Sequence, residues 1–174
     1  MIRSRLVTVL GLLALSAPAH AATESAKFDA AMRPILDHYL KSAASLAADS
    51  DKGVADGARA IEKLCAGLPA VKGPSAARYA ELPGKIKAAA AKVAASRDLA
   101  SRRETFKELS RALVSWTVLS KPADLNVIVC SMAKAPWIQR TATIANPYYG
   151  SKMLRCGEIV SGPAKGKSDG HMKK

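Results

Sequence analysis

The residues with the clearest chemical potential are sulfur-bearing side chains between residues 130 and 156. The chain contains three cysteines and five methionines, and two of each fall within this segment. They form a Cys-x-Met pair at its start and a Met-x-x-Cys pair at its end. Thiolate and thioether sulfurs are soft ligands that prefer Cu(I) or Ag(I) to Mg²⁺, Ca²⁺ or Mn²⁺. One interpretation is therefore a soft-metal site made of Cys130, Met132, Met153 and Cys156.

Two other interpretations of the same sulfur atoms stay open. In an exported protein, Cys130 and Cys156 can form a structural disulfide, which is the more common use of such a pair. In the chain-entropy picture, closing a loop of this length stabilises a protein by roughly 3–4 kcal/mol. The sulfur atoms can also simply fill the core, as buried methionines often do. A disulfide and a metal site are compatible, because the disulfide can form when metal is absent.

Local structure within the segment can turn each sulfur pair toward one side. Residues two apart in a strand face the same way, and residues three apart share one face of a helical turn. Between the pairs, Asn-Pro favours a turn, and the glycine that follows permits a positive φ. Aromatic side chains can pack the loop onto the rest of the domain. The residues expected to shape and cover the site are Trp137, Asn146, Pro147, Tyr148, Tyr149, Gly150 and Gly157.

The residues before this segment predict the helices that must position it. Apolar side chains recur at spacings of three and four, which is the pattern of amphipathic helices. Pro83-Gly84 interrupts or restarts one helix, and Ser101 with Glu104 forms a capping box at the start of the last one. The four expected helices cover about 27–48, 51–66, 75–99 and 101–120.

The pattern changes after Pro122. Residues 125–130 are rich in β-branched side chains and predict a short strand, with which residues 157–160 can pair. We therefore expect an all-α protein: a compact bundle of about four helices, closed by a short two-stranded or hairpin-like Cys/Met segment. One domain is expected over 24–161, carrying the motif at 130–157, with a flexible basic tail at 162–174.

The N-terminus predicts export. Residues 1–21 combine a basic start, a short apolar run and an Ala-x-Ala end, as in a cleavable signal peptide. We expect a periplasmic or secreted protein with no transmembrane segment after cleavage. The formal net charge of +13 is spread along the chain. The most common meaning of such a distribution is a solvated surface with no partner. If a partner exists, an anionic membrane surface or an acidic protein is favoured over a nucleic acid.

Enzymatic activity is not expected. Neither His38 nor His171 is near a plausible nucleophile in sequence, and a Cys-x-x-Cys motif is absent. His171 lies in the basic tail, where it offers no fixed geometry for a ligand. Cys65 falls on the apolar side of a predicted helix, where a free cysteine usually acts as a small hydrophobic residue.

The C-terminal segment resembles a known bacterial family. Cys130-x-Met132, Trp137 and the run from Asn146-Pro-Tyr-Tyr-Gly150 to Met153-x-x-Cys156-Gly157 look like the signature of domain-of-unknown-function family 3347. The resemblance covers roughly residues 26–160. One departure is Ser131, where family members often have proline between the Cys and the Met.

The resemblance implies a role in metal handling. Members of this family occur as small exported proteins and attached to heavy-metal efflux membrane-fusion proteins of the CusB type. We therefore expect a periplasmic Cu(I)- or Ag(I)-binding accessory protein, with an efflux membrane-fusion component or another envelope protein as partner. The alternative is a non-catalytic interaction module locked by a Cys130–Cys156 disulfide.

Overall fold

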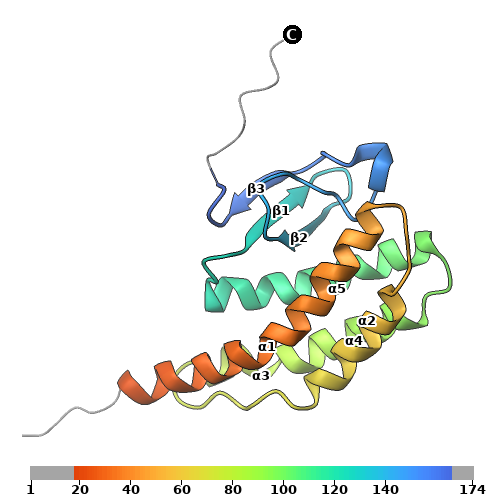
Figure 1. The fold of residues 1–174 in the computed structure, drawn as a ribbon. Coiled ribbons are helices and arrows are strands. Elements are labelled where there is room, and N and C mark those ends of the chain that lie inside the picture. Colours follow the sequence, from red (N-terminus) through yellow and green to blue (C-terminus); the bar gives the residue numbers. More distant parts are fainter. Residues whose placement is uncertain (1–17, 166–174) are drawn as a thin grey trace, which may run out of the picture.

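Helices make up most of the computed structural model, which describes residues 18–165, with side chains from residue 24 onward. A three-stranded antiparallel sheet and a short 3-10 helix follow the helices in the chain (Figure 1). The elements are α1 (Pro18–Ala47), α2 (Val54–Cys65), α3 (Ala76–Ala80), α4 (Leu82–Ala95), α5 (Leu99–Ser120), β1 (Asn126–Cys130), β2 (Ala135–Gln139), η1 (Gly150–Met153) and β3 (Glu158–Ser161).

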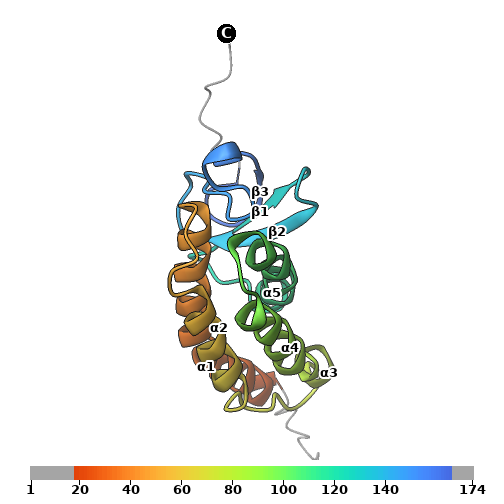
Figure 2. The same ribbon diagram turned by 90° about the vertical axis from the view of Figure 1, so that its right-hand side faces the viewer.

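The long helices form two adjacent pairs below the sheet. Helix α2 packs against α1 and α4, and α5 packs against α4 and β2 (Figures 1 and 2). Aromatic side chains join the pairs, since the Tyr39 and Phe106 rings stack with centroids 4.9 Å apart. At another point of the core, Trp116 donates a 2.8 Å hydrogen bond to Asp29. These contacts form the platform on which the sheet rests.

The expectation of an all-α fold is wrong. The predicted pairing of β1 with β3 is present, but β2 also pairs with β1, so the C-terminal segment is a sheet of order β2-β1-β3 rather than a hairpin. Strand β2 escaped prediction because it is short and contains Pro136. Proline cannot donate a hydrogen bond to a neighbouring strand, so it argues against a central strand. Since β2 lies at an edge of the sheet, this proline is tolerated.

The predicted helical stretches are helical, but three helix boundaries differ from expectation. Helix α1 begins at Pro18 rather than near residue 27, so Pro34 lies inside it. The third stretch divides into α3 and α4, with Pro83 in the first turn of α4, where its missing N–H costs nothing. Helix α5 begins at Leu99, and its capping box consists of Asp98 and Ser101 rather than Ser101 and Glu104. The sequence pattern predicts Ser101 as the cap, but Asp98, three residues earlier, takes that position.

Some predicted features lie partly or wholly outside the described residues. The expected signal peptide has residues 1–17 outside them, and His171 in the expected tail is also outside. At the other end, the described chain continues past β3, where Ala164 is buried and its amide donates a 2.9 Å hydrogen bond to Asn126. Within residues 18–165, every helix is too short or too polar to cross a bilayer.

Candidate functional site: a cysteine pair between the sheet and the C-terminal loop

Alternation along β1 places Cys130 on the face of the sheet that the C-terminal loop covers. Successive strand residues point to opposite sides, so Ile128 and Cys130 share a face. Trp137 pairs with Ile128 across the strands and belongs to the same face. A Cβ on Gly157 would lie 2.5 Å from the Trp137 ring and 2.8 Å from Ile128. The segment that carries Cys156 therefore lies directly on this face.

The structure brings Cys130 and Cys156 into contact. Their Sγ atoms are 3.2 Å apart, and both residues are free thiols. Cys130 is fully buried at the end of β1, whereas Cys156 is half-buried. The Ala133 amide also donates to the Cys130 sulfur at 3.4 Å, from the turn that joins β1 to β2. Two thiols from segments 26 residues apart thus form one site.

Hydrogen bonding separates the acidities of the two thiols. Burial raises the pKa of Cys130, but hydrogen bonds from Ala133, Cys156, Asn146 and Met132 together hold the pKa below its usual value. The hydrogen bond that Cys156 donates to Cys130 raises the pKa of Cys156, and burial acts in the same direction. Cys130 is therefore the more acidic thiol of the pair.

Asn146 organises the loop around the pair. Its Nδ2 donates to the Cys156 carbonyl at 2.7 Å, and its Oδ1 accepts the Tyr148 amide at 2.8 Å. The second bond is the side-chain turn that Asn forms readily with the residue two positions later. The Asn146 amide donates in turn to the Leu154 carbonyl at 2.8 Å. Because these bonds hold both ends of the loop, Asn146 sets the position of Cys156 relative to β1.

An ion pair ties this loop to the helices. Arg103 on α5 contacts Asp49 at 2.7 Å and also donates to the carbonyls of Leu46 and Pro147. The other oxygen of Asp49 accepts the Ser151 amide at 2.9 Å. Hydrogen bonds from Arg103 and Ser151 hold the pKa of Asp49 well below its usual range. The end of α1, the start of α5 and the loop therefore meet at one carboxylate.

The predicted aromatic residues pack the loop against the sheet and helices. Trp137 and Tyr148 are buried with their rings edge to face, at a centroid distance of 5.8 Å. The Tyr148 hydroxyl donates to the Pro136 carbonyl, and its ring lies 6.5 Å from that of Phe106. Tyr149 is only half-buried, and its hydroxyl donates to the Met132 carbonyl at 3.2 Å. The loop is therefore anchored on both β2 and the β1–β2 turn.

The two methionines of the predicted cluster lie at the surface side of the site. Met132 is in the β1–β2 turn with 62% of its surface exposed, so its thioether is not buried with Cys130. Met153 ends η1 and is half-buried, and its carbonyl accepts the Cys156 amide at 3.0 Å. The structure thus assembles the two thiols and leaves the thioethers on flanking turns.

The remaining candidates stand apart from the pair. Cys65 is buried in α2, where burial raises its pKa to about 11 and Lys87 and Glu62 are its charged neighbours. His38 lies half-buried on α1 beside the surface formed with α2. Among residues 18–165, no group of three or more His, Cys, Asp or Glu side chains is placed so that it could hold a metal ion.

Sequence reasoning missed the residues that support the site from a distance. Asp49 and Arg103 are 54 positions apart, and neither has a local pattern that links it to the loop. The Ala133 amide is also invisible to side-chain motifs, because any residue would supply it. A conspicuous signal exists only for Asn146, whose Asn-Pro sequence predicted the turn.

Comparison with known proteins supports a family but not an activity. Searches of curated proteins and of solved structures find no significant match. A family model matches residues 35–124, which run from the middle of α1 to the residues before β1. The match therefore covers the helices and ends before Cys130, so the C-terminal motif lies outside it. Since more than half of the chain is matched, the protein belongs to the family described as "Protein of unknown function (DUF3347)".

Proposed function

We propose that the protein is an exported accessory protein that binds Cu(I) or Ag(I) through Cys130 and Cys156. The observation that carries the proposal is the 3.2 Å contact between the two sulfur atoms. Thiolates suit soft monovalent metals. Because the two sulfur atoms are in contact, one metal ion can bind to both of them. In this role the protein links to heavy-metal efflux or tolerance, with an envelope component as its partner.

The acidity of Cys130 supports metal capture by the pair. A thiolate, not a thiol, is the metal ligand, and the pKa of Cys130 is lowered by its hydrogen bonds. Cys130 would therefore give up its proton to an entering metal more readily than an ordinary cysteine does. The hydrogen bond to Cys130 is the largest cause of the raised pKa of Cys156, and a bound metal would replace that bond.

The positions of the methionines support a secondary role as thioether ligands. Met132 is exposed on the turn directly after Cys130, and Met153 precedes Cys156 by three residues. The hydrogen bond from Tyr149 to the Met132 carbonyl holds that turn beside the start of η1. Both thioethers therefore belong to segments that flank the thiols in the chain.

The test is a Cu(I) titration of the purified protein against a competing chelator, with free thiols counted before and after oxidation. We expect one equivalent of Cu(I) to bind the reduced protein only. Cys130→Ser and Cys156→Ser should abolish tight binding, and Met132→Ala or Met153→Ala should weaken it. Cys65→Ala is the matched control, because it removes a buried thiol elsewhere and should leave binding intact. Copper affinity that is indifferent to Cys156→Ser refutes the proposal.

The same sulfur contact favours a second candidate, an interaction module locked by a disulfide. Oxidation would remove two protons and two electrons from Cys130 and Cys156 and pass them to a disulfide-type oxidant. The bond would tie the Cys156 loop to the sheet and stabilise the protein by roughly 3–4 kcal/mol. This candidate predicts that Cys130→Ser lowers the melting temperature sharply in oxidised protein, whereas the methionine variants change only packing.

A further inference from the structure

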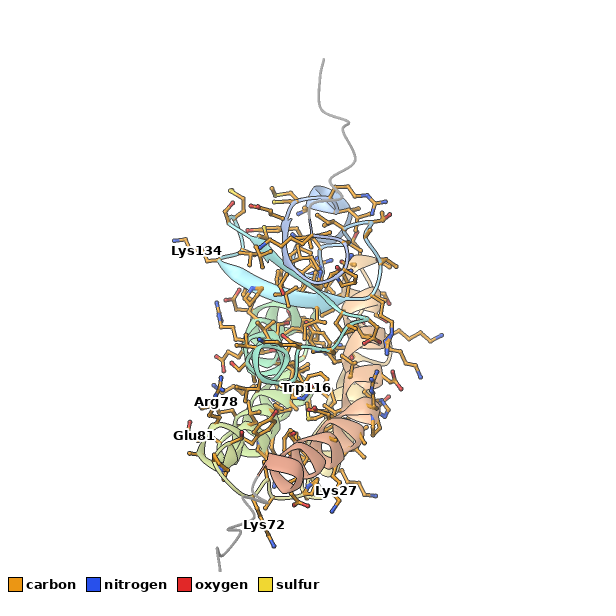
Figure 3. All side chains as sticks on the ribbon, turned by 90° about the vertical axis from the view of Figure 1, so that its left-hand side faces the viewer. Lys27, Lys72, Arg78, Glu81, Trp116 and Lys134 are labelled. Carbon is orange, nitrogen blue, oxygen red and sulfur yellow. The ribbon has the colours of Figure 1, made fainter. Side chains whose placement is uncertain are left out.

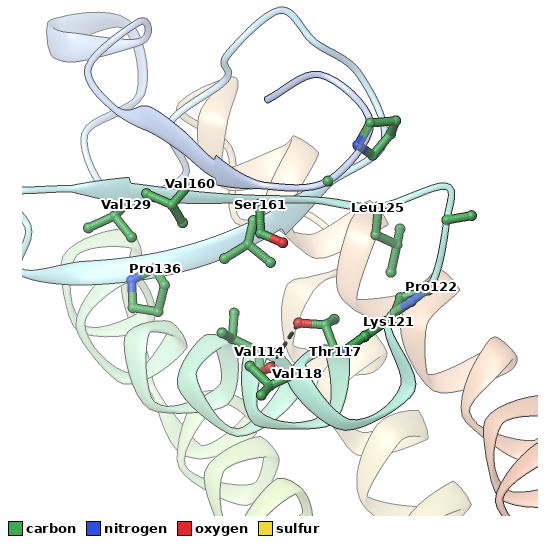
Figure 4. A pocket seen from close by; sticks show the side chains of 14 residues that line it. Val114, Thr117, Val118, Lys121, Pro122, Leu125, Val129, Pro136, Val160 and Ser161 are labelled. Atoms are coloured by element: carbon green, nitrogen blue, oxygen red, sulfur yellow. Dashed lines mark hydrogen bonds between the residues drawn. The ribbon is translucent and has the colours of Figure 1, made fainter. Parts of the chain in front are cut away.

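A second candidate site lies on the other face of the sheet. A groove of about 700 Å³ runs between the C-terminal half of α5 and the strands (Figure 4). Val114 and Val118 line it from the helix, and Val129, Pro136 and Val160 line it from the sheet. Since Val129 and Pro136 pair across β1 and β2, they share the face opposite to Cys130. The groove is therefore separate from the cysteine pair.

The walls of the groove leave aliphatic surface in water. Val118 is 59% exposed, Val129 37% and Val160 36%. Among the described residues these are three of the four large apolar side chains that are exposed, and they converge on one groove. Scattered apolar residues need no explanation, but a contiguous apolar patch usually marks a binding surface. The volume falls in the range of small-molecule sites, roughly 300–1,000 Å³.

One end of the groove is positively charged. Lys121, the residue directly after α5, is the one charged residue among those that line the groove. The nearest acid in sequence, Asp124, is already engaged by Arg33 and Arg140. Within residues 18–165, Lys121 has no ion-pair partner of its own. The groove thus combines an aliphatic wall with a cation at its rim.

We propose that this groove binds a single-chain anionic amphiphile of the fatty-acid class. The hydrocarbon chain would cover the aliphatic side chains of Val118, Val129 and Val160, while the Thr117 hydroxyl in the same wall is already bonded to the Val114 carbonyl. The carboxylate would lie at the rim beside Lys121. This site does not depend on the metal function, since it uses the opposite face of β1.

The test is a titration of the purified protein with dodecanoate, kept below the concentration at which it forms micelles and followed by NMR of the valine methyl groups. We expect one equivalent to bind, with the largest shifts at Val118, Val129 and Val160. Dodecanol should bind more weakly than dodecanoate, and the dodecyltrimethylammonium ion more weakly still.

Two variants test the aliphatic wall and the charged rim of the groove separately. Val118→Asp should weaken binding at least about tenfold, because it places a carboxylate against the hydrocarbon chain. Lys121→Gln should weaken dodecanoate about two- to fivefold, the effect of one exposed ion pair, and leave dodecanol unchanged. Lys72→Gln is the matched control, since Lys72 lies at the end of the molecule away from the sheet (Figure 3) and should change nothing.

Three outcomes would overturn the proposal. The first is a set of shifts that avoids the groove valines, and the second is equal affinity for the anionic and cationic probes. The third is a dimer in light scattering that Val118→Asp dissociates, because a second copy of the chain would then be the occupant. If Val118→Asp does not fold, Lys121→Gln and the head-group series still decide the matter.

Discussion

Gly157 provides the sharpest test of how the C-terminal loop is seated on the sheet. Its φ is +155°, a backbone conformation that residues other than glycine rarely adopt. A Cβ at this position would approach the Trp137 ring to 2.5 Å and Ile128 to 2.8 Å, and both neighbours are fully buried. Gly157→Ala should therefore lift the loop off the sheet and move the adjacent Cys156 away from Cys130.

The expected loss of stability has two sources. Overpacking a buried contact costs about 1–3 kcal/mol, because neither the indole ring nor the strand can retreat freely. The unfavourable φ adds about 1–2 kcal/mol. The total of about 2–5 kcal/mol is a large part of the unfolding free energy of an ordinary domain, which is about 5–15 kcal/mol.

Urea denaturation of the reduced protein measures this loss as a lower midpoint at an unchanged slope. Gly84→Ala is the matched control. A Cβ on Gly84, in the first turn of α4, meets no atom within 4 Å, so alanine should be neutral or stabilise by up to about 1 kcal/mol. A second readout is the rate at which Cys130 and Cys156 form a disulfide, which should fall in Gly157→Ala only. A loss below about 1 kcal/mol together with an unaltered disulfide rate would refute the seating of the loop described above.

Three further predictions concern single side chains. Tyr39→Phe should cost about 1–3 kcal/mol in urea denaturation, because it removes the buried partner of Ser110 (2.8 Å) and of the Ile138 amide (3.2 Å). A cost near zero would show that these groups find other partners. Asp49→Asn should flatten the acid limb of the stability curve. The hydrogen bonds from Arg103 and Ser151 lower the folded-state pKa of Asp49, so its contribution is present above the unfolded pKa of about 3.9 and is lost as the pH falls toward the folded value. The same acid limb in wild type and variant would contradict this assignment. In an ultraviolet thiolate titration of the native protein, the first thiol to ionise should vanish in Cys130→Ser, and Cys65 should ionise near pH 11. An early ionisation that survives Cys130→Ser would show that the thiolate is on another cysteine.

The helices were accessible to sequence analysis because their signals are local. Apolar residues at spacings of three and four mark the buried face of α1, which includes Met32, Ile35 and Tyr39. Likewise, the β-branched run before Cys130 predicted β1. Cap positions were less certain, since Asp98 and Ser101 are both good caps and only the course of the chain selects one.

The sheet was only partly accessible. Strand β2 carries Pro136, which reads as a break unless the strand is known to lie at an edge. Edge position depends on the pairing of β1 with β3, which brings together residues about thirty positions apart. Sequence patterns reflect the conformational preferences of residues that are neighbours along the chain. They do not show whether a strand lies at the edge or in the middle of a sheet.

The sequence by itself determined which residues can do chemistry: two cysteines and two methionines around an Asn-Pro turn, in a chain of amphipathic helices. Only the tertiary structure decided that Cys130 and Cys156 touch while Met132 remains exposed. It also decided that Arg103 and Asp49 hold the loop, and that β1 separates the thiols from an aliphatic groove. The physical reason is that ligand identity is a property of single side chains. Contact, acidity and exposure instead depend on packing between segments that the chain order keeps far apart.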